Sequence, residues 1–289
     1  MTATNNISWN RLTQDFDEGL NETLQQQFHA AQFIALVGKH LIPQREDDSN
    51  TNLQYQAPGE RFVGNKIPGG FRIALHLHEL KLQILDVNDK VAAVIPLIGR
   101  TKTEIFGILK QQLEDSGVDV SSLTSKMHYE VPEHKLDSDA SFSLNAEKHI
   151  KENIYYRGNA EIILNTAAAK FPKAEPVRIW PHHFDTGSFV PLEMNEAGGV
   201  SRSMGLGWAI PDTMVDEPYY YLSYWSEVPV ENFNSLPDPD TGKWMRTGWN
   251  GGILRISEIL KATTAEEQLA MVESFFNSGI KILFEHISL

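Results

Sequence analysis

The chain has 289 residues, of which 41% are hydrophobic and 22% are charged. These values are ordinary for a folded globular protein, and the length allows one or two domains. Its 25 basic and 38 acidic residues leave a formal net charge of −13, which disfavours partners such as nucleic acid or an anionic membrane. The sequence contains no cysteine, so disulfides, thiolate catalysis and thiolate-bound metals are excluded.

The N-terminal residues, MTATNNISWNRLTQDFDEGL, do not read as a signal peptide, because no charged region precedes an apolar run. No stretch approaches the 18 apolar residues of a membrane span. We therefore expect a soluble cytoplasmic protein. Residues 1–19 are polar and predict a loosely ordered lead-in.

Hydrophobic periodicity predicts the main elements. Helical spacing covers about 21–42, 101–117, 145–170 and 264–286, and the last of these helices opens on a capping box of Thr264 and Glu267. Alternation or short apolar runs predict strands at about 71–86, 91–97, 177–189, 203–210, 218–225 and 249–256. Helices that follow hairpin-like strands predict an α+β fold, mostly antiparallel β-sheet flanked by helices.

The helix ends TKTEIFGILKQQLEDSGVDV and TTAEEQLAMVESFFNSGIKI resemble each other. This suggests two similar helix–strands–helix halves, an N-terminal α+β half over 20–140 and a C-terminal α+β half over 145–289. The alternatives are that helix ends simply look alike, and that both halves pack as one domain. No G-x-G-x-x-G follows a strand and no Walker A loop is present, so the usual nucleotide-binding folds lose support.

Four motifs occur in order between residues 177 and 260: WPHHFD, GLGWAIPD, DEPYYYLSYW and WMRTGWNGGIL. In this order they resemble a family of uncharacterised bacterial proteins known only as a domain of unknown function. FRIALHLHELKLQILD and GVDV resemble the N-terminal part of the same family less distinctively. The resemblance implies no activity and assigns no catalytic residue.

Candidate chemistry centres on IWPHHFD, residues 179–185, in the C-terminal half. If this stretch is a strand, His183 and Asp185 share one face while Trp180 and His182 share the other. A carboxylate beside an imidazole fixes its tautomer and raises its basicity, as general bases and metal ligands require. The alternative is that the histidines are structural and hydrogen-bonded across strands.

A divalent transition metal such as zinc is a candidate cofactor, with His182, His183 and Asp185 as ligands. The pattern H-H-x-D is not a known metal signature, so a further ligand has to come from elsewhere in the chain. The candidates for that ligand are Glu217, Asp212, Glu193, and the pair His76 and His78 on the predicted N-terminal strand.

Aromatic residues form a second signal, because five of the six tryptophans fall between residues 180 and 249. Such side chains can line a small-molecule pocket, although many pack inside a sheet. The predicted substrate-binding residues are Trp180, Trp208, Tyr221, Trp225, Trp249 and Arg202.

Two functions follow from these patterns. The first is a metal-assisted hydrolase or another acid/base enzyme, with His183, Asp185 and Glu217 as catalytic residues. The alternative is a non-catalytic small-molecule-binding protein with an aromatic-lined pocket and structural histidines. Both imply a small-molecule partner, and neither involves nucleic acid or membrane. A serine triad through Ser201 or Ser203 has no support from local spacing.

Overall fold

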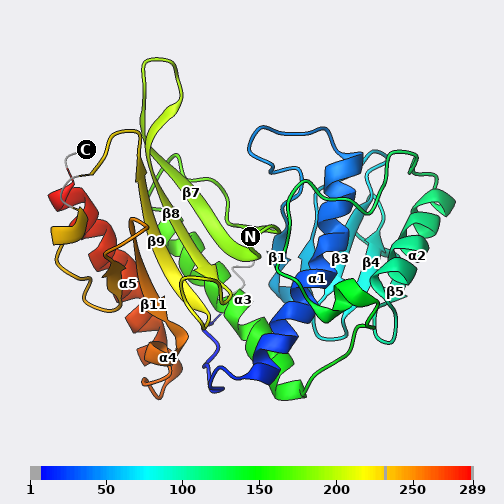
Figure 1. Ribbon diagram of the computed structural model, residues 1–289, viewed down its shortest axis with the longest axis horizontal. Coiled ribbons are helices and arrows are strands. Elements are labelled where there is room, and N and C mark those ends of the chain that lie inside the picture. The colour runs from blue at the N-terminus through cyan, green and yellow to red at the C-terminus, as the bar shows by residue number, and fades with distance from the viewer. Residues whose placement is uncertain (1–7, 231–232, 288–289) are drawn as a thin grey trace, which may run out of the picture. The chain divides into compact units, whose positions relative to one another are not determined.

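The structure is a computed structural model that describes residues 8–230 and 233–287 (Figure 1). It contains two antiparallel sheets, one of five strands and one of six, together with flanking helices. This arrangement confirms the predicted α+β fold class. Within the described part of the chain, no helix is both long and apolar enough to cross a lipid bilayer.

The chain divides into two compact units that are interleaved in the sequence. The N-terminal unit consists of Asp17–Ile154 and Arg178–Phe184. The C-terminal unit consists of the described residues within Met1–Phe16, Tyr155–Val177 and Asp185–Leu289.

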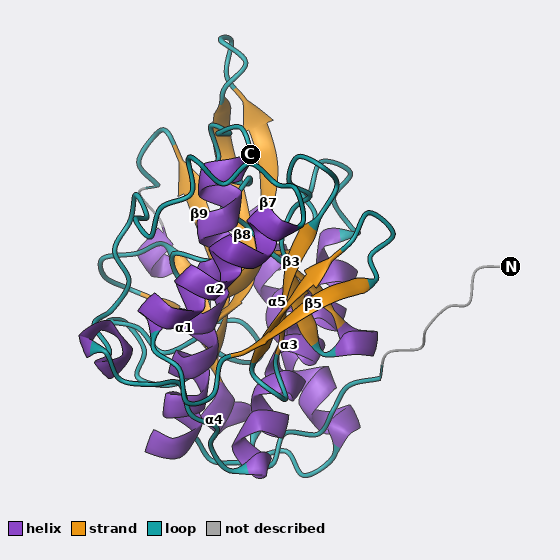
Figure 2. Cartoon of the chain, turned by 90° about the vertical axis from the view of Figure 1, so that its right-hand side faces the viewer, coloured by secondary structure: helices purple, strands orange, loops and turns teal. Residues whose placement is uncertain are grey.

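The N-terminal unit contains a meander of five antiparallel strands and two main helices. Its elements are α1 (Glu18–Leu41), β1 (Gln54–Gln56), β2 (Arg61–Val63), β3 (Arg72–His76), β4 (Lys81–Leu85), β5 (Val91–Pro96), α2 (Lys102–Asp115), the short 3-10 helix η2 (Lys135–Ser138), the first turns of α3 (Glu147–Ala168), and β6 (Arg178–Trp180). Strands β1 to β5 are neighbours in sequence order. Helix α1 contacts β3 and α2 contacts β5 (Figures 1 and 2).

The alternation of FRIALHLHELKLQILD produces one buried face of this sheet. Leu75 pairs with Phe62 on one side and with Leu82 on the other, and all three side chains are fully buried. The stretch forms two strands rather than one, because the chain turns between β3 and β4 with Leu80 in the left-handed region at φ 45°. Both outcomes, one strand or two, were open from the alternation alone.

The C-terminal unit is built around the strands of the second half. Its elements are the rest of α3, β7 (Asp185–Met194), β8 (Val200–Ala209), β9 (Tyr219–Ser226), a 3-10 turn η3 (Phe233–Ser235), β10 (Lys243–Met245), β11 (Gly251–Arg255), α4 (Ile256–Ile259) and α5 (Ala265–His286). These strands lie in the order β10-β11-β9-β8-β7. The capping box of Thr264 and Glu267 is present at the start of α5, as predicted.

Helices α3 and α5 cover one face of these strands. Trp208 of β8 lies against Tyr156 of α3, with ring centroids 5.5 Å apart, and Tyr220 of β9 contacts Phe276 of α5 at 6.2 Å. The opposite face carries Tyr221, whose ring lies so close to β8 that a Cβ atom at Gly207 would collide with it. Bulky side chains therefore fill one face, and glycine makes room on the other.

The lead-in predicted over residues 1–19 is firmly packed where the structure describes it. Leu12 is buried, and its backbone N–H and carbonyl both bond to the buried amide of Gln268 on α5, at 2.8 and 2.9 Å. Trp9 stacks on Tyr220. Isolated apolar residues in a polar segment gave no periodic signal, which is why the sequence suggested loose order. The part of this prediction that concerns residues 1–7 lies outside the described chain.

Candidate functional site

The WPHHFD segment is a turn between two strands rather than a continuous strand. Strand β6 ends at Trp180 and β7 begins at Asp185, and the backbone N–H of Phe184 donates to the Trp180 carbonyl at 2.7 Å. Phe184 has a φ of 56°, which no strand residue adopts. The predicted alternation of faces is therefore wrong, because a tight turn after Pro181 replaces the extended backbone it assumed.

The first half of this turn packs inside the N-terminal unit. Gln32 of α1 donates through Nε2 to the Pro181 carbonyl at 2.8 Å, and its Oε1 accepts from the Tyr129 hydroxyl at 2.9 Å. The ring of His182 lies 5.8 Å from that of Tyr129 and 6.3 Å from that of Trp180. His182 and Trp180 thus belong to an aromatic cluster that fixes the turn.

The three predicted catalytic residues have different surroundings. His183 is exposed on the turn. Asp185 accepts a 2.5 Å hydrogen bond from the Tyr221 hydroxyl, and burial together with this carboxylate raises the pKa of Tyr221 well above its ordinary value. Glu217 is held by Arg255 at 3.0 Å and by Ser257, whose backbone N–H and hydroxyl both donate to it. Glu217 thus stabilises the start of α4.

The structure gives no support to the predicted metal set of His182, His183 and Asp185. Among the described residues, no group of three or more His, Asp or Glu side chains is arranged to hold a metal ion. Two of the candidate extra ligands have other partners, since Asp212 accepts from the Tyr219 hydroxyl at 2.7 Å and Glu193 pairs with an arginine. Metal-assisted hydrolysis at this segment stays a prediction.

The remaining candidate histidines each lie beside a glutamate. His76 is 3.8 Å from Glu79, and His78, which lies in the β3–β4 turn, is 2.9 Å from Glu147. The two imidazoles therefore do not project from one strand face as a chelating pair, because the strand ends at His76.

The predicted substrate-binding residues also lie in different surroundings and do not form one site. Trp208 is fully buried, with the guanidinium of Arg157 4.6 Å above its ring, so it belongs to the core. Arg202 forms an ion pair with Glu193 at 3.2 Å. Trp225 is 51% exposed and lines an open groove together with Trp249, in the C-terminal unit.

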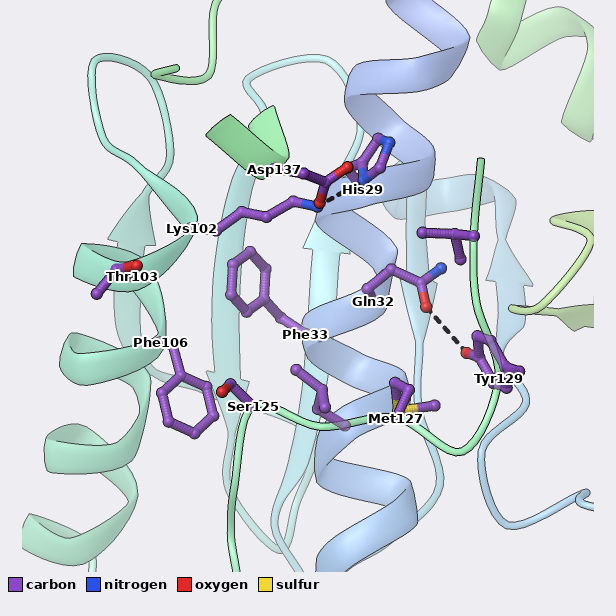
Figure 3. Close-up of a pocket in the computed structure, with 12 residues that line it drawn as sticks. His29, Gln32, Phe33, Lys102, Thr103, Phe106, Ser125, Met127, Tyr129 and Asp137 are labelled. Atoms are coloured by element: carbon purple, nitrogen blue, oxygen red, sulfur yellow. Dashed lines mark hydrogen bonds and ion pairs between the residues drawn. The ribbon is translucent and has the colours of Figure 1, made fainter. Parts of the chain in front are cut away.

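A cavity of about 340 Å³ lies wholly within the N-terminal unit (Figure 3). Helix α1 forms one wall, the first turns of α2 form another, and residues of the segment 125–131 cross over the front. The apolar part of the lining consists of Phe33, Leu36, Phe106, Met127 and Val131. The three residues Lys102, His29 and Asp137 lie together at one end, and the other polar lining residues are Gln32, Thr103, Ser125 and Tyr129.

Lys102, His29 and Asp137 form that polar end. The Nζ atom of Lys102 lies 2.7 Å from Nδ1 of His29 and 2.5 Å from Oδ1 of Asp137. Because an ammonium group has three N–H donors, these two acceptors leave one donor unassigned.

The chemistry of His29 is fixed by its surroundings. Its side chain is fully buried, and burial, followed by the positive charge of Lys102, lowers its pKa from 6.5 to about 4. His29 is therefore neutral at pH 7, accepts from Lys102 at Nδ1 and carries its proton on Nε2. Burial alone would raise the pKa of Asp137, but hydrogen bonds from Lys102 and from the His134 backbone, together with the positive charge of Lys102, outweigh this and lower it.

The local sequence places Lys102 at a helix position where a positive charge is unfavourable. Thr101 caps α2, accepting from the Glu104 backbone while the Glu104 carboxylate accepts from the Thr101 N–H, so Lys102 is the first residue of the helix. A cation is disfavoured at this positive end of the helix dipole. Asp137 compensates for this unfavourable positive charge. The Lys102–Asp137 pair therefore allows a lysine at a position that helix formation alone would not favour.

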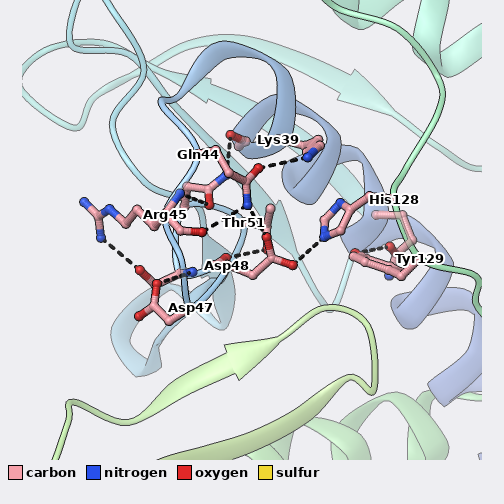
Figure 4. A network of polar contacts seen from close by, with 12 residues as sticks. Lys39, Gln44, Arg45, Asp47, Asp48, Thr51, His128 and Tyr129 are labelled. Atoms are coloured by element: carbon pink, nitrogen blue, oxygen red, sulfur yellow. Dashed lines mark hydrogen bonds and ion pairs between the residues drawn. The ribbon is translucent and has the colours of Figure 1, made fainter. Parts of the chain in front are cut away.

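The segment across the front of the cavity is anchored by a polar network (Figure 4). His128, between the cavity residues Met127 and Tyr129, forms an ion pair with Asp48. Asp48 also accepts from the Gln44 amide at 2.5 Å, and the Gln44 carbonyl oxygen accepts from Lys39 of α1 at 2.8 Å. The front wall of the cavity is thereby tied to the C-terminal end of α1.

The sequence offered only weak signals for this site. His29 and Gln32 are polar residues on the buried side of the helix predicted over 21–42. Polar residues at such positions are the one sequence signal that could have indicated this site. Lys102 follows the cap residue Thr101 in the sequence, but its partner Asp137 is 35 residues away and in no motif. Tertiary contact alone brings them together.

Comparisons with known proteins do not assign this chain to a family. The chain matches no protein-family profile, no curated protein and no solved structure. The resemblance to a bacterial family of unknown function therefore stays an expectation. The information about function comes from the chain's own candidate sites.

Proposed function

We propose that the protein binds a small amphipathic molecule in the cavity of the N-terminal unit. The volume of about 340 Å³ falls at the small end of the range of ligand sites, and a mostly apolar wall with a few convergent polar groups is their usual composition. The observation that carries the proposal is a cavity in which apolar side chains line one part and Lys102, His29 and Asp137 meet at one end. The proposal keeps the small-molecule-binding alternative predicted from the sequence, but it moves the binding site from the C-terminal aromatic residues to the N-terminal cavity.

The polar end determines which head group the ligand carries. Lys102 can donate to a ligand and His29 is neutral, so an acceptor such as a carboxylate, carbonyl or hydroxyl oxygen is favoured, although Asp137 already offsets part of the lysine charge. An ammonium head group would face Lys102 and lose the hydrogen bond. The proposed ligand therefore has an apolar body and an uncharged or anionic oxygen head.

Three probes that share one apolar chain test this preference. Octanoate, octan-1-ol and octylammonium differ only in the head group, and calorimetric titration of the purified protein measures the affinity of each. We expect octanoate to bind most tightly and octylammonium most weakly. The Lys102→Met variant should lose about tenfold or more in octanoate affinity, corresponding to ~1.4 kcal/mol, while its octan-1-ol affinity changes less.

Matched variants separate the cavity from the rest of the surface. Ser125→Trp places an indole at the cavity front, whereas Ser121→Trp substitutes an exposed serine of the same loop that does not line the cavity. Lys90→Met removes an exposed lysine in a turn and controls for charge. Binding that survives Ser125→Trp, or that falls equally in Ser121→Trp and Lys90→Met, would overturn the proposal.

A further inference from the structure

A second candidate site lies in the C-terminal unit, on the sheet face that α3 and α5 do not cover. Tyr221, Ser223 and Trp225 alternate along β9, so their side chains project from the same face. Trp225 is 51% exposed and makes no ring contact with any described aromatic residue. About half of this large side chain is therefore open to solvent and available to a ligand.

Trp249 is fixed in place beside this strand. Its ring lies so close to β11 that a Cβ atom at Gly251 would collide with it, and it meets the ring of Tyr221 edge-on, with centroids 6.4 Å apart. This is the physical reason for glycine in the GWNGG motif. Trp249 and Trp225 line the same open groove of about 630 Å³.

The groove is also lined by uncharged hydrogen-bonding groups. The side chains of Asn234, Thr247 and Asn250 form no hydrogen bond with the described residues, and Ser223 makes only a long 3.5 Å contact to a backbone carbonyl. Among the residues that the structure describes, no aspartate or glutamate lines the groove, and Arg246 is the one charged side chain in its lining.

Arg246 is already occupied. It donates to the backbone carbonyls of Asn234 and Leu236 and forms a 2.7 Å ion pair with Asp238. Its charge is therefore compensated within the protein, so the groove offers aromatic faces, amides and hydroxyls without a net charge for an ionic ligand.

We propose that this groove binds a neutral saccharide. The apolar C–H face of a sugar ring packs on an exposed indole, and its hydroxyls exchange hydrogen bonds with amide and hydroxyl side chains. An anionic sugar would need a free cation, which Arg246 does not provide. A proline-rich peptide would use the tryptophans but leave the amides and hydroxyls mostly without partners.

The test presents the purified full chain to an array of neutral and acidic oligosaccharides and proline-rich peptides, and then titrates the strongest neutral glycan by calorimetry. We expect binding to neutral glycans, at least a tenfold loss of affinity in Trp225→Ala, and a smaller loss in Trp225→Phe. Met194→Ala removes an exposed apolar residue that does not line the groove and should have no effect.

Other outcomes overturn the proposal. These are no neutral-glycan binding, selective binding of the peptides or of acidic glycans, or equal affinity of wild type and a folded Trp225→Ala. The melting temperature of each variant checks that the fold is retained. The Lys102→Met variant should keep full glycan affinity, because the groove and the cavity are separate sites with separate ligands.

Discussion

The ammonium of Lys102 lies 2.7 Å from Nδ1 of His29, so a histidine on α1 is held neutral by its burial and by a cation at the start of α2. Asp137 balances the cation from the other side at 2.5 Å. The three residues come from three segments that are far apart in the sequence. Their arrangement makes the end of the cavity polar while keeping the imidazole uncharged, and several measurable consequences follow from it and from the fold around it.

The first consequence is a loss of stability in mild acid. Because the pKa of His29 is lowered from 6.5 to about 4 in the folded chain, the unfolded chain takes up a proton between these values while the folded chain does not. The free energy of unfolding therefore falls as the pH falls below 6.5, by about 2 kcal/mol from this group at pH 5.

Urea unfolding at pH 7.5, 6.5, 5.5 and 5.0 measures this effect. His29→Gln should be less stable than wild type at pH 7.5 but lose less stability on acidification, since glutamine does not titrate. Parallel pH profiles for the two proteins would contradict the assignment of a neutral, buried His29.

A glycine to alanine change should reveal how closely Tyr221 lies on the sheet. Gly207→Ala brings a methyl group into the Tyr221 ring and should destabilise the protein by about 1–3 kcal/mol. Combined with Tyr221→Ala, the same change should cost much less than it does alone. In Gly107→Ala, within α2, the new methyl meets nothing within 4 Å, so stability should stay equal or rise by up to about 1 kcal/mol. Thermal unfolding compares wild type, the three single variants and the double variant.

The two histidines of WPHHFD should behave differently. His182→Ala removes ring contacts with Tyr129 and Trp180 and should cost about 1 kcal/mol of unfolding free energy. His183→Ala alters an exposed turn residue and should change stability by less than about 0.5 kcal/mol. Equal costs in chemical denaturation would show that the turn is not organised as described.

Elemental analysis decides the metal prediction at the same segment. Wild type and a folded His183→Ala/Asp185→Ala variant are purified without tags and compared after incubation with zinc. Because the described residues hold no three-ligand group, we expect the same metal content in both. Stoichiometric metal in wild type that is lost in the variant would restore the metal-assisted hydrolase as the leading function.

Gln268 should be essential for anchoring the segment around Leu12. Gln268→Leu leaves the Leu12 N–H and carbonyl without their partner in a buried position and should cost roughly 2–4 kcal/mol. Lys281→Leu, on the exposed side of the same helix, should change stability by less than about 0.5 kcal/mol. Proteolysis near Trp9 that is no faster in Gln268→Leu than in wild type would contradict this anchoring role.

Long periodic patterns predicted most of the fold. The helices expected over 21–42 and 264–286 are observed as Glu18–Leu41 and Ala265–His286, because each carries an apolar stripe and the second carries its own capping box. The strand expected over 177–189 failed at Pro181. In this four-residue turn the residue with left-handed backbone angles is Phe184. Glycine or asparagine at that position would have indicated a turn in the sequence, whereas phenylalanine does not.

The candidate sites were less predictable than the fold. Trp225 and Trp249 were singled out because they belong to the aromatic residues concentrated between 180 and 249, and both line the groove. Trp208 was singled out on the same grounds, yet it points to the opposite face of the sheet and is fully buried. The cavity was missed because His29 and Asp137 meet Lys102 only through tertiary contact.

Met127 lines the N-terminal cavity, so its methyl group reports directly on whether a small amphipathic ligand binds there. Spectra of the protein with ¹³C-labelled methionine methyl groups, recorded during titration with octanoate, follow Met127 inside the cavity and the exposed Met194 as an internal control. We predict that the Met127 methyl shifts and saturates, that Met194 does not move, and that Ser125→Trp abolishes the change. An unchanged Met127 signal at octanoate concentrations that saturate binding by calorimetry would show that the ligand binds elsewhere and would contradict the proposed function.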